Sequence, residues 1–222
     1  APSVYTLPQS AFVSQTYNNC GPAALSMVFS SYGLSINQEE LGQKMRPFNS
    51  MYGGNDDKSV FPDEFVRTAK EYGFEALNRP NGDITLLKKL IANDIPIVVR
   101  TWLNPGEDIG HFRIIRGYDD AKQVLIQDDS YQGQGLTYSY DEVDQMWKPF
   151  NYGYILVYPK EKQEIVATIL GENMDEKVAY QNALIRANAD LESNPEDIYA
   201  EFNRATAFYR LGDSKRAVES YD

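Results

Sequence analysis

The chain has 222 residues, of which 32 are acidic and 21 are basic, so its formal net charge is −11. Such an acidic surface repels nucleic acid and anionic membranes, which we therefore exclude as partners; a basic peptide is a more natural ligand. The sequence has no apolar run of membrane-spanning length, no cysteine and histidine cluster for zinc and no glycine-rich phosphate loop. We expect no metal and no cofactor.

The first predicted helix follows the only cysteine of the chain, Cys20. Pro22 suits the first helical position, apolar residues from Leu25 to Tyr32 recur at helical spacing, and Gly33 is placed to end the helix. Cys20 is therefore expected at or just before a helix N-terminus. Such sites lower a thiol pKa from about 8.5 to roughly 3.5 to 7.5.

The middle of the chain alternates between loops and short regular elements. Residues 46–60 read as a long loop that could border a substrate cleft, and 104–108 as a second loop. Helices are predicted at 61–72, 83–93 and 141–147, and strands at 95–102 and 152–158.

The only histidine, His111, begins an apolar run that predicts a strand buried on both faces. Residues 117–120 read as a turn and 123–127 as the returning strand of a hairpin. Asp128 then falls on the same edge as His111, where a carboxylate could hold the imidazole in one tautomer. The neighbouring Asp129 is the alternative, and the phase of the strand favours Asp128.

Cys20 and His111 are the only possible thiol and imidazole of a catalytic pair in this chain. The structural alternatives are a small buried apolar cysteine and a hydrogen-bonded core histidine. One cysteine cannot form an internal disulfide, so the redox compartment is not indicated.

The combined order of these residues resembles the papain-like cysteine peptidases of the bacteriocin-processing, double-glycine-leader group and their stand-alone relatives. The likeness covers residues 1–160 and an α+β fold with N-terminal helices and a C-terminal antiparallel sheet is implied. The matching residues are Gln15, Cys20-Gly21-Pro22, Gly110-His111-Phe112, Gly117-Tyr118-Asp119 and Asp128.

By this resemblance Cys20 would be the nucleophile, His111 the general base and acid, and Asp128 the residue that orients His111. Gln15 and a backbone N–H at Cys20 would form the oxyanion hole. Family members commonly have Asp-Pro at the third position, whereas this chain has Asp128-Asp129-Ser130. For substrate binding we expect Asn19, Gly110 and Trp102, and the aromatic side chains of Tyr131 and Trp147 are further candidates for a peptide groove.

After Lys160 the apolar residues switch to helical spacing. Residues 200–221 resemble a tetratricopeptide repeat, and a step back of about 34 residues predicts a degraded first copy whose turn falls at 178–179. Residues 161–222 would then hold about one and a half repeats, with an ordinary helical hairpin as the alternative. Because the second repeat is incomplete, we expect the last helix to pair with another chain, for example in a homodimer, or the array to be truncated.

These features predict thiol-dependent hydrolysis of peptide bonds, with a substrate or protein partner held by the repeats. The alternatives are a binding or scaffold protein with an idle peptidase fold, and acyl or isopeptide transfer by the same residues. The start at Ala1 instead of Met, and the frequent export of the family, favour a bacterial extracytoplasmic location.

Overall fold

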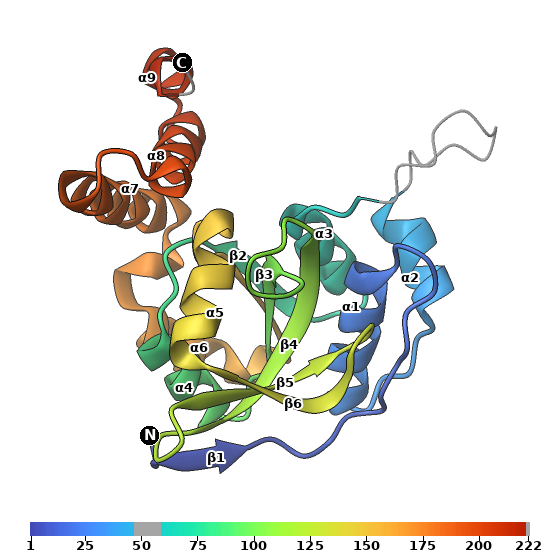
Figure 1. Ribbon diagram of the computed structural model, residues 1–222. Helices are drawn as coiled ribbons and strands as arrows, with labels where there is room; N and C mark the ends of the chain where they lie inside the picture. The colour runs from blue at the N-terminus through green and yellow to red at the C-terminus, as the bar shows by residue number, and fades with distance from the viewer. Residues whose placement is uncertain (47–58, 221–222) are drawn as a thin grey trace.

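The computed structural model describes residues 1–46 and 59–220. Within these ranges the chain forms a seven-stranded antiparallel sheet with helices on both faces, followed by a group of C-terminal helices (Figure 1). Most of the loop expected at 46–60 lies outside the described residues.

The sheet has the strand order β2-β7-β3-β4-β5-β6, and β1 pairs with the end of β4 beyond β3. Its strands are β1 (Val4–Thr6), β2 (Glu75–Arg79), β3 (Ile97–Trp102), β4 (Gly110–Asp119), β5 (Val124–Asp129), β6 (Gly133–Ser139) and β7 (Tyr154–Tyr158). The predicted hairpin is confirmed, although β4 runs through 117–119 before it turns. The short β1, β2 and β6 were not predicted, because none carries a long apolar alternation.

The helices α1 (Cys20–Ser31) and α3 (Pro62–Glu71) cover one face of the sheet, and α2 (Gln38–Met45) packs against these two helices. The opposite face packs on α4 (Ile84–Ile91), α5 (Tyr140–Trp147) and α6 (Gln163–Leu170). Side chains of successive strand residues point to opposite faces, so Val98 packs on the α1 side while Ile97 and Val99 pack on the α4 side. This alternation divides the buried residues into two apolar cores.

The helix after the cysteine starts at Cys20 itself, as expected. Pro22 is the third residue of α1 rather than the first, a position that it tolerates because the first N–H groups of a helix have no acceptor within it. Gly33 follows the helix with a φ of +82°, a conformation that glycine adopts without a steric penalty.

The C-terminal part contains the helices α7 (Glu176–Ser193), α8 (Ile198–Arg210) and α9 (Ser214–Glu219). The chain also has three short 3-10 segments. The first, η1 (Lys148–Phe150), lies between α5 and β7, and η2 (Lys160–Lys162) and η3 (Gly171–Met174) flank α6. Helices are therefore present after residue 160, but positions 178–179 lie inside α7 and form no turn. The turn that the repeat spacing of about 34 residues predicted at 178–179 is therefore absent from the structure. The assignment to tetratricopeptide repeats and the dimer through the last helix stay predictions.

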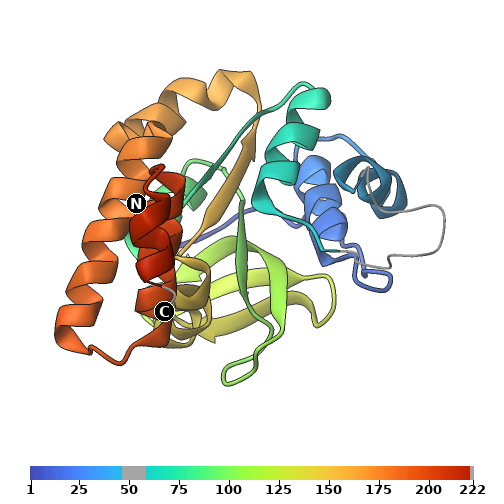
Figure 2. The ribbon, with the colours of Figure 1, turned by 90° about the horizontal axis from the view of Figure 1, so that it is seen from above.

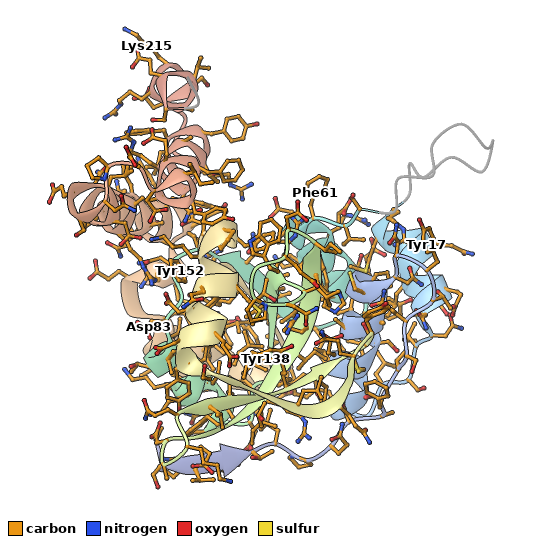
Figure 3. All side chains as sticks on the ribbon, in the orientation of Figure 1. Tyr17, Phe61, Asp83, Tyr138, Tyr152 and Lys215 are labelled. Carbon is orange, nitrogen blue, oxygen red and sulfur yellow. The ribbon has the colours of Figure 1, made fainter. Side chains whose placement is uncertain are left out.

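Polar and aromatic contacts fix α7 and α8 against the sheet domain. Lys148 pairs with Asp190 at 2.9 Å and with Asp197, the N-cap of α8, at 2.7 Å. The Arg186 guanidinium of α7 lies 3.3 Å from the ring centroid of Tyr152. Figure 3 shows Tyr152 where the C-terminal helices approach α5, and Figure 2 shows these helices on the side of the molecule opposite to α1 and α2.

Candidate active site

The N-terminus of α1 packs against the start of β4, which brings Cys20 beside His111. Cys20 and His111 line the same cavity, and each side chain shifts the pKa of the other. Asn18, just before the helix, has a φ of +52°, which asparagine tolerates better than most residues. This turn leads the chain from Gln15 into α1, so that both Gln15 and Cys20 reach the same cavity.

The carboxylate that holds His111 belongs to Asp129, whose Oδ1 lies 2.8 Å from His111 Nε2. The prediction that Asp128 holds His111 was wrong. Ile114 of β4 stands opposite Asp128 of β5, so the next residue, Asp129, comes beside Arg113. Opposite residues of an antiparallel pair share a face, and Arg113 shares its face with His111. Strand phase therefore selects Asp129 for the histidine.

Asp128 faces the other side of the sheet and has a structural role. Its Oδ2 lies 2.9 Å from Arg116 Nε and accepts a hydrogen bond from Gln9 Nε2 at 2.7 Å. Its Oδ1 accepts from the backbone N–H of Gly135. Arg116 lies two residues after Ile114, so strand alternation places it on the same face as Asp128.

Several donors surround the Asp129 carboxylate. The backbone N–H groups of Tyr131 and Gln132 donate to its Oδ1 at 2.8 and 3.0 Å, and Arg113 Nη2 lies 3.5 Å from its Oδ2. Burial alone would raise the pKa of Asp129, but the hydrogen bond and charge of His111, helped by Arg113, lower it below the ordinary value. Asp129 is therefore an anion fixed in position before any substrate binds.

The thiol and the imidazole shift each other toward the charged pair. Burial acts to raise the pKa of Cys20, but the hydrogen bond and charge of His111 outweigh it, and the pKa is lowered. Backbone N–H groups of Phe112 and Gly21 add to this lowering. Burial acts to lower the pKa of His111, whereas Asp129 and Cys20 raise it above the ordinary value. Since Nε2 contacts Asp129, Nδ1 is the ring nitrogen left for the thiol.

Gln15 lines the same cavity with its side-chain orientation fixed. Ser130 Oγ donates a hydrogen bond to Gln15 Oε1 at 2.9 Å, and the Gln15 backbone N–H donates to the Ser130 carbonyl at 2.9 Å. The Oε1 atom is thereby occupied, which leaves the Nε2 donor of Gln15 for a ligand. The N–H of Cys20, the first residue of α1, has no acceptor within the helix.

The cavity at the nucleophile has a volume of about 370 Å³. It contains both the thiol and the imidazole, with Tyr131 and Ile109 at its exposed rim. Its lining residues are Gln15, Asn18, Cys20, Gly21, Ser59, Val60, Arg100, Leu103, Ile109, Gly110, His111, Phe112 and Tyr131. The expected Gly110 and Tyr131 therefore lie at the cavity.

Three other residues expected at the cavity lie elsewhere. Asn19 is buried, and its amide is bound by Thr16, Gln38 and Arg46. Trp102 packs edge-on against Phe150 and Tyr199, and Trp147 is a core residue whose indole N–H donates to the Gly153 carbonyl. For aromatic residues the sequence does not distinguish a cavity wall from a core, because both need the same apolar character.

Sequence reasoning missed Arg100 and Ser130 as residues of the site. Arg100 sits in a strand that was correctly predicted, but its alternation with Val99 and Thr101 gives no indication that a cavity lies beside it. Ser130 follows the two aspartates directly, and only the tertiary structure brings it to Gln15.

Residues 4–155 match the Peptidase_C39 like family, so the chain belongs to that family and is a cysteine peptidase-like hydrolase. No curated protein matches the chain.

Solved structures share the fold at low sequence identity. The peptidase domain of Streptococcus ComA, a bi-functional ABC transporter of a quorum-sensing pathway, is 22% identical, with 67% of this chain and 97% of that chain covered and a TM-score of 0.53. A C39-like peptidase from Bacillus anthracis is 16% identical, with 72% and 99% covered and a TM-score of 0.58. A double-glycine-motif protease of an AMS/PCAT transporter, solved with its leader peptide, is 18% identical, with 70% and 95% covered and a TM-score of 0.53.

Among the described residues no helix is long and apolar enough to cross a membrane. In the same ranges no three histidine, cysteine or acidic side chains are grouped as metal ligands.

Proposed function

We propose that this chain hydrolyses peptide bonds by a thiol mechanism with Cys20, His111 and Asp129. The observation that carries the proposal is that Cys20 and His111 line one open cavity, with the imidazole held by the Asp129 carboxylate. The binding of a leader peptide by the AMS/PCAT protease of similar fold supports a peptide as the substrate.

In this mechanism the Cys20 thiolate attacks the carbonyl carbon of the scissile bond. The resulting oxyanion accepts hydrogen bonds from Gln15 Nε2 and the Cys20 N–H. The His111 imidazolium then gives its proton to the leaving amine, and a thioester remains on Cys20. His111 next takes a proton from water, the hydroxide attacks the thioester, and an acid leaves as the thiolate returns. Asp129 stays ionised throughout and stabilises the imidazolium.

The C-terminal helices would hold the substrate or a protein partner close to this cavity. The helix α8 carries exposed apolar side chains, including Ile198, Phe202 and Tyr209. Patches of such side chains commonly mark interaction surfaces. In this proposal the helices act as a tetratricopeptide-type module that presents a protein to the peptidase domain.

The test is exposure of the wild-type chain to a proteome-derived peptide library, with new termini identified by mass spectrometry. We expect cleavage by the wild type, none by Cys20→Ala, and a rate about 100 to 10,000-fold lower for His111→Ala. A parallel reaction with an added amine distinguishes hydrolysis from acyl transfer. Absence of new termini and of amide products in both reactions would contradict the proposal and favour an idle binding protein.

A further inference from the structure

A second cavity lies next to the catalytic one, between the sheet domain and the C-terminal helices. Its volume is about 180 Å³, and Arg100 and Phe112 line both cavities. Part of the remaining wall comes from η1, α7 and α8, through Phe150, Tyr180 and Phe202, and the rest comes from the sheet domain. A peptide bound at Cys20 can therefore extend past Arg100 and reach the C-terminal helices.

The guanidinium of Arg100 is held between aromatic rings near the nucleophile. Its central carbon lies 4.9 Å from the Phe150 ring centroid and 5.7 Å from that of Phe112. Gly110 provides the space: a Cβ at this position would come within 3.1 Å of Arg100 Nη2. Burial lowers the pKa of Arg100, and the charge of Cys20 partly opposes this effect.

Arg100 differs from the arginines around it in having no carboxylate partner within the described residues. In the same sheet, Arg113 pairs with Asp129 and Arg116 pairs with Asp128. Arg210 of α8 pairs with Asp63 and Glu176. The chain has a net charge of −11, so carboxylates outnumber basic side chains, and yet this arginine in a cavity has no carboxylate partner among the described residues. A planar guanidinium on an apolar wall is suited to bind a carboxylate through two hydrogen bonds.

The wall of the second cavity also contains polar atoms without hydrogen-bond partners among the described residues. Asn203 is 3% exposed; its Nδ2 donates to the Lys148 carbonyl, while its Oδ1 has no partner. Asn151 Nδ2 is likewise buried and unpaired. A buried polar group without a hydrogen-bond partner lowers the stability of the protein. Hydrogen bonds from these side chains to a bound peptide would remove this cost.

We infer that this second cavity is a substrate subsite in which Arg100 binds a carboxylate of the peptide close to the scissile bond. The carboxylate is either an acidic side chain or the C-terminal carboxylate of the peptide. The inference rests on the proposed peptidase function. It also gives the C-terminal helices a direct part in specificity, since α8 supplies one wall. Attraction of a basic peptide by the overall charge is compatible with this local preference for one acidic group.

The test compares matched short peptides cleaved by the wild type, in which Glu replaces Gln at each position in turn and the C-terminus is free or amidated. We expect kcat/KM for one acidic peptide to exceed its neutral match by about 10 to 100-fold, the range for a hydrogen bond to a charged group. Arg100→Gln should reduce this ratio to near one, and Arg100→Lys should keep part of it. Arg67→Gln, which removes an exposed arginine of α3, should keep the full ratio.

The two sources of the carboxylate give different results. A preference that survives amidation of the C-terminus assigns an acidic side chain, and one that is lost assigns the terminal carboxylate. A wild-type ratio near one, or a ratio unchanged by Arg100→Gln, would overturn the inference. The same holds if Arg100→Gln moves Cys20 alkylation to higher pH while the ratio is unchanged, since Arg100 would then serve only the thiolate.

Failure of the peptidase function is distinguishable from failure of this inference. If the wild type cleaves no peptide, binding of fluorescently labelled Glu and Gln peptides to the Cys20→Ala protein is measured by anisotropy. Tighter binding of a Glu peptide, lost when Arg100→Gln is added, would support the subsite without catalysis. Equal binding of the Glu and Gln peptides would overturn it.

Discussion

Asp128 and Asp129 are adjacent in β5, yet their carboxylates act on opposite faces of the sheet. Asp129 accepts the hydrogen bond of His111, and Asp128 pairs with Arg116. Both side chains are fully buried, so the two residues form a matched pair for mutation.

Asp129→Asn should impair catalysis. The neutral amide cannot stabilise the imidazolium and can donate to His111 Nε2, which favours the wrong tautomer. We expect kcat to fall by about 100 to 10,000-fold, the usual range for disabled general acid and base catalysis. The measurement is kcat on a cleaved peptide, and an unchanged value would exclude Asp129 as the residue that orients His111.

Asp128→Asn should instead lower stability. Removing one partner of a buried ion pair leaves the Arg116 charge uncompensated, and we expect the free energy of unfolding to fall by about 3 to 5 kcal/mol. Urea denaturation measures this loss. The pH profile of Cys20 alkylation by the folded variant should match the wild type, and a shift in that profile would show that Asp128 also serves the catalytic pair.

The reactivity of Cys20 should have an unusual pH dependence. The lowered pKa of Cys20 keeps a thiolate at pH values where an ordinary thiol, with a pKa of about 8.5, is protonated, and the raised pKa of His111 keeps an imidazolium above about pH 6.5. Rapid alkylation by iodoacetamide should therefore persist to lower pH than for an ordinary thiol. The value of kcat/KM should fall on the acid side as the thiolate is protonated and on the alkaline side as the imidazolium loses its proton.

His111→Ala supplies the control for this profile. Without the imidazole, burial remains as the larger influence and raises the pKa of Cys20, so fast alkylation should move to higher pH. Intact mass gives an unambiguous signal because the chain has one cysteine. An ordinary thiol profile in the wild type, identical in His111→Ala, would mean that the pair is not charged in the free protein.

Gln15→Ala should remove one donor from the oxyanion hole. The expected loss is about 2.7 to 4 kcal/mol of transition-state stabilisation, or about 100 to 1,000-fold in kcat. Ser130→Ala removes only the hydrogen bond that orients Gln15, and one such bond contributes about 0.5 to 1.5 kcal/mol, so a loss of about 2 to 10-fold is expected. If Gln15→Ala slowed the alkylation of Cys20 by the same factor as kcat, the substitution would have disturbed the nucleophile rather than the oxyanion hole.

Lys148→Met should loosen the C-terminal helices. It removes the ammonium shared by Asp190 and Asp197, and we expect about 1 to 3 kcal/mol less stability, the usual cost when charged hydrogen bonds are lost. Limited proteolysis should cut faster within 159–200. Lys122→Met is the matched control, because that side chain is 76% exposed and should change stability by less than about 0.5 kcal/mol. Equal proteolysis of both variants would contradict a docking role for Lys148.

The sequence by itself determined the family, the catalytic pair and the main elements. Cys20 and His111 are unique in the chain, so no other thiol and imidazole could pair. Local signals also placed α1, α3, α4 and the β4–β5 hairpin, because caps, prolines and apolar spacing act over a few neighbouring residues. The same signals predicted helices after residue 160, but the repeat spacing failed at α7, where helix continues through the expected turn.

Only the tertiary structure decided which aspartate meets His111, because a change of one residue in phase moves a side chain to the other face of a sheet. The position of Ile114 opposite Asp128 sets that phase, and it depends on pairing between two strands. Long-range contact likewise separates Trp102 and Asn19 from the cavity and brings Arg100 to it, beside helices more than seventy residues later in the chain. Residue type and local spacing carry no information about such neighbours.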